Sequence, residues 1–266
     1  MRAADYIEDH PVFRHEDFVA AHTKGGRSRA TSNNLLAKHV GTGRLLRVRK
    51  GLYARVPRGQ DLATAPIDPY LLACNLSPGA VVAYHAALQF HGRAYSVWRV
   101  YHFLTRARAR PFEYRGLEFT PTRAPSTIRE LPDFGGGIET VDHAGGRVRV
   151  ATLERTLVDV LHAPDKGGGW EEIWRSLESV EYFDLDAVIE YAVKLGSVIT
   201  VARVGFFLDQ HQGELMVDSA HLDRLKRHAP RQPRYFDPGR KPGRMVTEWN
   251  LIVPQSVLDK SWEREQ

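Results

Sequence analysis

The stretch "RLLRVRKGLYARVP", residues 44–57, decides the fold of the N-terminal part of the chain. Apolar and cationic residues alternate up to Lys50-Gly51 and alternate again on the way back. A period of two with a glycine at the corner predicts a β-hairpin with one buried face. We expect the buried face to carry Leu46, Val48, Leu52, Ala54 and Val56. The opposite face then carries Arg47, Arg49, Tyr53 and Arg55.

The residues before this hairpin predict three helices. A short helix is expected over residues 3–9 and a second over residues 15–23, with Gly25-Gly26 as the break after it. The third runs from about Ser28 to Val40, with Ser28 or Thr31 as its N-cap. Two helices, a turn, a helix and a two-stranded wing form the order of a winged helix-turn-helix, assigned to residues 1–58. Phe18, Leu35 and Leu36 are expected to close its core together with the hairpin.

The charge of this region is one-sided. No Asp or Glu occurs from Phe18 to Gln60, whereas ten Lys and Arg do, in a chain whose net charge is +5. A segment with one sign of charge attracts a partner of the other sign, and phosphate is the usual one. The alternative is a basic surface that serves solubility alone.

The predicted geometry divides the candidate contacts into two groups. Because a helix fits the major groove of DNA, which is about 12 Å wide, the start of the third helix is expected to meet base edges and the wing to meet phosphates. The base candidates are Arg27, Arg29, Thr31, Asn33 and Asn34, and the phosphate candidates are Arg47, Arg49 and Lys50. The DNA-binding surface as a whole adds Ser28, Lys38, Arg44, Tyr53 and Arg55. For Asn33 and Asn34, plain polarity at an exposed helix start is the alternative.

Residues 56–68 predict a linker, and residues 66–266 a larger mixed α+β domain. Helices are expected in "DPYLLACNL" and in "VVAYHAALQFHG", which ends at Gly92. Strands are expected over residues 96–105, on both sides of Gly116, and in a hairpin that turns at Gly145-Gly146. "TLERTLVDVLHAP" predicts a helix capped by Thr152, several helices follow between Trp170 and His228, and residues 244–254 predict a final strand or strand pair. The fold class is therefore α+β.

Motifs for catalysis or metal binding are missing from the sequence. No HExxH, paired CxxC, GxSxG, GxxxxGK[ST] or GxGxxG occurs, and we expect no cofactor, no metal and no enzymatic activity. The alternative is a nucleic-acid-processing enzyme, nuclease-like, targeted by the winged helix. Cys74, in the apolar context "LLACNL", is expected to be a buried, inert thiol. No signal peptide and no apolar run of about 20 residues is present, so a cytoplasmic protein without a membrane partner is expected.

Several separated motifs resemble one known family. "GRLLRVRKGLYARVP" is followed by "VVAYHAALQFHG" and later by "VRVATLERTLVDVLHAPDKGGG". In that order they resemble the AbiEi-type antitoxins of bacterial type IV toxin–antitoxin systems, over roughly residues 10–180. The resemblance implies a sequence-specific transcriptional repressor whose winged helix binds inverted repeats in the double-stranded operator DNA of its own operon. It also implies a C-terminal domain active against a toxin of nucleotidyltransferase type.

Three features remain open at the level of sequence. Within the "ERTL.D" segment, Glu154, Arg155 and Asp159 are expected to satisfy one another structurally rather than to catalyse. A second basic region has two interpretations: an edge strand whose cations block pairing, or a second nucleic-acid surface. Its residues are Arg93, Arg99, Arg106, Arg108, Arg110, Arg115 and Arg123, and residues 224–234 could join them. A wing used for protein–protein contact is a third possibility for the N-terminal domain.

Overall fold

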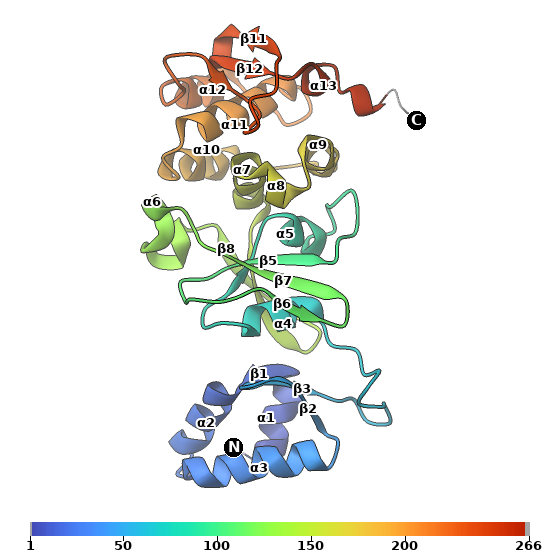
Figure 1. Cartoon of the computed structure of the whole chain (residues 1–266). Coiled ribbons are helices and arrows are strands. Elements are labelled where there is room, and N and C mark those ends of the chain that lie inside the picture. The colour runs from blue at the N-terminus through green and yellow to red at the C-terminus, as the bar shows by residue number, and fades with distance from the viewer. Residues whose placement is uncertain (1, 264–266) are drawn as a thin grey trace. The chain divides into compact units, whose positions relative to one another are not determined.

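The computed structural model describes residues 2–263, which fold into two compact units (Figure 1). The first unit contains the chain up to Val82 together with residues 99–122 and 140–150. The second contains residues 83–98, residues 123–139 and the chain from Ala151 onward. Helices and sheets are present in both, so the α+β prediction is confirmed. The units divide the chain differently from the predicted boundary between residues 58 and 66, which stays a prediction.

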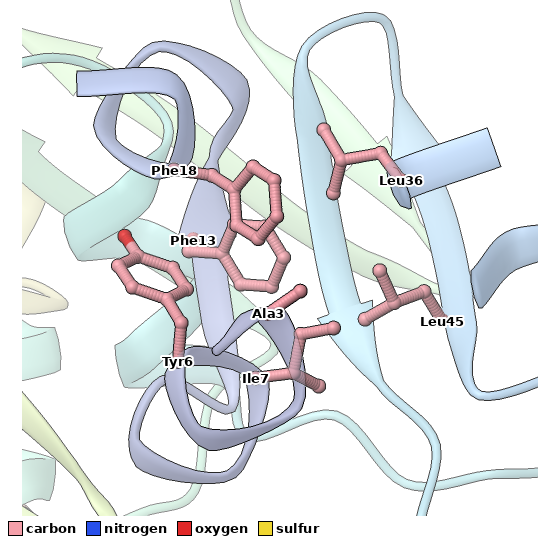
Figure 2. Close-up of a cluster of buried hydrophobic side chains, with 7 residues drawn as sticks. All are labelled: Ala3, Tyr6, Ile7, Phe13, Phe18, Leu36 and Leu45. Atoms are coloured by element: carbon pink, nitrogen blue, oxygen red, sulfur yellow. The ribbon is translucent and has the colours of Figure 1, made fainter. Parts of the chain in front are cut away.

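The N-terminal module, residues 2–58 of the first unit, has the expected helices and hairpin and one further strand. The added strand, β1, pairs with β3 in an antiparallel sheet of order β1-β3-β2. Its buried core is an aromatic and aliphatic cluster that includes Tyr6, Phe13 and Phe18 (Figure 2). The elements are α1 (Ala3–Asp9), β1 (Val12–Arg14), α2 (His15–Lys24), α3 (Arg29–Gly41), β2 (Leu45–Arg49) and β3 (Leu52–Arg55).

Local sequence explains where these elements begin and turn. The Ser28 side chain accepts a hydrogen bond from the Thr31 backbone N–H at 3.1 Å, so Ser28 is the N-cap of α3. Gly51 lies at φ +79° in the hairpin turn, a left-handed conformation that glycine adopts without steric cost. The predicted corner at Lys50-Gly51 is therefore confirmed.

The predicted burial of Leu52, Ala54 and Val56 is confirmed, but the expectation that this face packs against the helices was wrong, because the face that carries Tyr53 packs there. Residues directly opposite one another in an antiparallel pair share a face. Tyr53 lies opposite Phe13 and Arg47, and with Leu45 it faces the helices. The Leu52 and Ala54 side chains, each 1% exposed, are buried on the other face of the sheet, where α4 (Pro69–Asn75) packs against β1.

The register of the β2–β3 pair changes between Arg47 and Arg49, and this contradicts the prediction that both arginines lie on one face. Arg47 pairs with Tyr53, but Arg49 pairs with Leu52, which lies on the opposite face. Such a bulge re-aims the side chains that follow it. Arg47 and Arg49 therefore do not share one cationic face.

The largest sheet is mixed and six-stranded, with the order β6-β7-β5-β4-β9-β8. Residues 81–82 form a strand, where a helix was predicted, and the helix α5 starts only at His85. The β8–β9 turn is Ala144-Gly145, both at positive φ, one residue earlier than predicted. The strands are β4 (Val81–Val82), β5 (Val100–Leu104), β6 (Phe112–Tyr114), β7 (Leu117–Thr122), β8 (Ile138–His143) and β9 (Gly146–Ala151).

The second unit is mainly helical. Helix α7 (Leu153–His162) packs against α10 and α11, and the Thr152 side chain caps it as predicted. The predicted helices and the final strand pair are confirmed. They are α5 (His85–Phe90), α9 (Trp170–Glu178), α10 (Leu185–Lys194), α11 (Val198–Gln210), α12 (Ser219–Lys226) and the small sheet of β10 (Arg234–Tyr235), β11 (Arg244–Val246) and β12 (Leu251–Val253). No helix within residues 2–263 is long and apolar enough to cross a membrane.

Arg155 at the start of α7 is 1% exposed and organises the loop over residues 133–137. Its Nε donates to Asp159 at 3.1 Å, and one terminal nitrogen donates to the Asp133, Phe134 and Gly136 carbonyls. All five residues of this loop lie at positive φ. The structural role expected for Arg155 and Asp159 is confirmed. Glu154 does not join them, because its carboxylate faces the Asp184 backbone N–H.

Candidate nucleic-acid interface

The starts of α2 and α3 and the turn of the β2–β3 hairpin border one groove of the first unit. The groove has a volume of about 590 Å³, and its remaining wall is the C-terminal end of α4 with Leu76 and Pro78. Five cationic residues line it, so basic side chains far apart in sequence gather there. They are Arg14, Arg29, Arg47, Arg49 and Lys50.

Hydrogen bonds hold the three walls together. The His15 backbone N–H donates to the Gly51 carbonyl at 2.8 Å, which joins the start of α2 to the hairpin turn. The His15 ring lies 2.8 Å from the Asn33 side-chain oxygen, and Arg29 forms an ion pair with Glu16 at 2.8 Å. These contacts orient α3 relative to α2.

The outer face of α3 is polar and free of bulky side chains. Thr31, Asn34 and Lys38 follow one another at helical spacing, and all three are exposed. Ala30 and Ala37 beside them are also exposed and small. A surface with this profile allows a close approach of the helix backbone to a partner.

Most of the predicted cations lack an acidic partner. Within residues 2–263, five of the predicted cations form no ion pair, and all five are exposed. These residues are Arg27, Lys38, Arg44, Arg47 and Lys50. Their charge is therefore available to an anionic partner.

Other predicted residues are engaged in contacts within the protein. The Arg49 guanidinium donates to the Leu76 carbonyl at 2.5 Å and stacks over Phe112 at 5.1 Å. The Tyr53 ring stacks on Phe13, with 5.8 Å between centroids, and packs against the core. Arg55 pairs with Glu8 at 2.6 Å. The expected outward orientation of Tyr53 was wrong for this reason.

Arg29 and Asn33 lie on the side of α3 that faces α2, through the contacts with Glu16 and His15 described above. Lys38 and Arg44 belong to the end of α3 and the loop after it, and they do not line the groove. The structure therefore brings together Arg29, Arg47, Arg49 and Lys50, and presents Thr31 and Asn34 on the outer helix face.

Two residues of the groove escaped the sequence interpretation. Arg14 and His15 precede Glu16 and Asp17, so they fall outside the acid-free stretch that singled out the others. Arg14 forms a two-point ion pair with Asp17, at 2.8 and 2.7 Å. No local pattern marks them, since β1, which positions Arg14, is only three residues long.

Electrostatic effects in the module agree with a crowded positive surface. Burial, with Arg44 and Lys38 nearby, lowers the pKa of His39 from its ordinary value. The hydrogen bond from His15, with Arg29 close by, lowers the pKa of Glu16. Burial also lowers the pKa of the Arg49 guanidinium, as expected for a cation held inside the first unit.

Metal-ligating clusters and the single thiol are the other features of the chain that could carry chemistry. In the described part of the chain, no group of three or more His, Cys, Asp or Glu side chains is placed to hold a metal ion. Cys74 is half-buried, and its Sγ lies 3.4 Å from the Arg149 carbonyl. Burial raises the pKa of this thiol to about 11, which makes it a poor nucleophile at neutral pH.

Comparisons with known proteins give a fold relationship. No family model and no curated protein matches the chain. A solved structure does match: the crystal structure of the RV2827C protein from Mycobacterium tuberculosis. It is 18% identical, with a TM-score of 0.57, and the match covers 99% of this chain and 93% of that one. At this identity the similarity establishes a shared fold and nothing about activity.

Proposed function

We propose that this protein is a sequence-specific DNA-binding repressor that acts on its own operon and serves as an antitoxin in a type IV toxin–antitoxin system. The observation that carries the DNA-binding part is the convergence of the α3 start and the hairpin turn on one groove lined by five cations. The proposal assigns the module the role of a winged helix, with no catalytic residue.

Within this proposal the helix and the hairpin have different tasks. Arg47 and Lys50 neutralise phosphates, which fixes the position of the protein on the duplex. Thr31 and Asn34, exposed on the outer face of α3, read base edges in the major groove. Arg29 and Asn33 orient the helix through α2, and Arg49 and Tyr53 hold the hairpin in place.

The test is a mobility-shift titration of the full chain on the DNA upstream of its own gene, with random duplex as the reference. Two contacted phosphates, at Arg47 and Lys50, predict a loss of affinity of about sevenfold for a threefold rise in salt concentration. Arg47→Ala with Lys50→Ala should weaken binding to all duplexes and reduce the salt slope by about two.

Two further variants distinguish the recognition of bases from the effect of the overall positive charge. Asn34→Ala should cost about 1–3 kcal/mol on the upstream DNA and little on random duplex. Arg231→Ala with Arg234→Ala removes two exposed charges from the second unit and should leave DNA binding unchanged. Equal affinity for upstream and random duplex, or binding insensitive to salt, contradicts the proposal.

The antitoxin part rests on the motif resemblance over residues 148–169 and is tested separately. Co-expression with a nucleotidyltransferase encoded next to this gene should restore growth that the toxin alone arrests. Persistent growth arrest with both proteins soluble contradicts this part and leaves the DNA-binding part intact.

A further inference from the structure

The segment from Arg224 to Val246 in the second unit is more strongly basic than the chain as a whole. It contains eight Lys and Arg against one acid, Asp237, whereas the net charge of the whole chain is +5. Asp237 is 8% exposed and accepts hydrogen bonds from the Trp170 indole and the Gly239 backbone, each at 2.8 Å. Its carboxylate also lies 4.0 Å from the Lys241 ammonium, and Arg224 pairs with Asp186, so six of the eight cations form no ion pair in the described part of the chain.

This segment supplies two strands of the small sheet of order β10-β12-β11. Tyr235 pairs with Ile252, and Ile252 pairs with Met245, so the three side chains form one row across the sheet. Leu251 and Val253, which alternate with Ile252, are 0% exposed and face the interior. The row therefore lies on the outer face, where Tyr235 is 42% and Met245 36% exposed.

Four arginines of this segment form no ion pair in the described part of the chain. Arg234 and Arg244 begin the strands β10 and β11. They pair with Leu251 and Val253, so their side chains leave the sheet on its inner face and reach solvent at its two edges, next to Tyr235 and Met245 in sequence. All four are exposed: Arg231, Arg234, Arg240 and Arg244.

We propose that this surface, the C-terminal sheet face, binds single-stranded nucleic acid. It is defined by Tyr235, Ile252 and Met245 with the four arginines. An exposed ring on a sheet offers a stacking platform for an unpaired base, and the exposed arginines at the sheet edges and in the adjoining loops supply positive charge for the flanking phosphates. A base stacks on such a ring only when it is unpaired, so this surface suits a single strand better than a duplex.

The site belongs to the second unit and is independent of the proposed duplex site. Its test is the fluorescence anisotropy of a labelled 12-nucleotide RNA of mixed sequence, titrated with the full chain. Tyr235→Ala should weaken binding by about fivefold or more, because stacking contributes about 1–3 kcal/mol per base. Tyr235→Phe keeps the ring and should bind as the native protein does.

A second variant does not depend on the aromatic residue. Arg231→Ala with Arg234→Ala should weaken RNA binding and flatten its salt dependence. Tyr182→Ala is the matched control, since Tyr182 is a 65% exposed tyrosine of the same unit that lies beside Glu181. This control should leave RNA binding unchanged.

The two nucleic-acid sites are distinguished by testing the variant of the N-terminal module for RNA binding. Arg47→Ala with Lys50→Ala should leave RNA binding intact, and excess duplex should not displace the RNA. Loss of RNA binding in that variant, or displacement by duplex, places the RNA at the N-terminal module and overturns the inference. Sedimentation with vesicles of phosphatidylglycerol and phosphatidylcholine, without RNA binding, overturns it in favour of a membrane. Failure of duplex binding alone affects only the proposed function.

Discussion

Arg155 illustrates how one side chain determines its surroundings. The loop over residues 133–137 turns its carbonyl groups toward the guanidinium, and its five positive φ values include those of Asp133 and Phe134, which lack the freedom of glycine. Asp159, which pairs with Arg155, also accepts a hydrogen bond from the Tyr191 hydroxyl at 2.8 Å. The arginine therefore neutralises the buried Asp159 carboxylate and also donates hydrogen bonds to the carbonyl groups of the strained loop.

Arg155→Ala should lower the free energy of unfolding by about 3–5 kcal/mol, because it leaves the Asp159 charge buried without its partner. Urea unfolding of the full chain, followed by circular dichroism, measures the change. Glu154→Gln is the control, since Glu154 is only half-buried and lies outside the pair. An Arg155 variant as stable as this control contradicts the assigned role.

At the scale of the element, the β2–β3 hairpin combines a turn, a bulge and two buried faces. Gly51 permits the turn, and its carbonyl binds the His15 backbone N–H, so the turn also positions α2. The bulge after Arg47 places Arg49 where it reaches Leu76 and Phe112. The hairpin therefore acts as a structural link as well as a candidate DNA contact.

Gly51→Ala should destabilise the N-terminal module by about 1–2 kcal/mol, because an alanine at φ +79° meets the steric cost of the left-handed region. Hydrogen exchange of the β2 and β3 amides in the full chain reports the local stability.

Gly41→Ala at the end of α3 serves as the comparison. Gly41 has no positive φ, and no atom lies within 4 Å of an added Cβ there. This variant should keep or increase protection, because alanine favours helix more than glycine does. Equal protection in both variants argues against a special requirement for glycine at position 51.

At the scale of the whole molecule, histidines in both units share one electrostatic property. Burial is the main cause that lowers the pKa of His39 in the first unit and of His85 and His162 in the second, each from an ordinary value of 6.5. For His85 the Glu172 carboxylate opposes the shift without reversing it. The folded protein therefore binds protons at these sites less readily than the unfolded chain does.

The expected consequence is a loss of stability in mild acid. As the pH falls through about 6.5, the unfolded chain takes up protons first, so the stability present above this pH decreases toward the lower folded pKa values. Urea midpoints at pH 7.5 and 5.5 should differ in this direction, and His39→Gln should make the difference smaller. A midpoint that rises on acidification contradicts the expected sign.

Patterns that depend on neighbours in sequence were predictable. The alternation and glycine around Lys50, the Ser28 and Thr152 caps and the helices after Trp170 are all local features, and the structure agrees with them. The short strands β1 and β4 were missed. They have three and two residues, which is too few to show an alternation of apolar and polar side chains. Arg14 was missed with β1 for the same reason, whereas His15 begins a helix that was predicted but lies outside the acid-free stretch that marked the candidate contacts.

By itself, the sequence determined the α+β class, the hairpin and its turn, and the one-sided charge of the first sixty residues, since each follows from residue type and spacing. Tertiary structure alone decided which hairpin face meets the helices, because both faces are buried and alternation cannot choose between two apolar environments. The tertiary structure also decided which cations form no contact within the protein and which are held by distant residues. A side chain such as Arg49 finds its partners at Leu76 and Phe112, at sequence distances that no local pattern encodes.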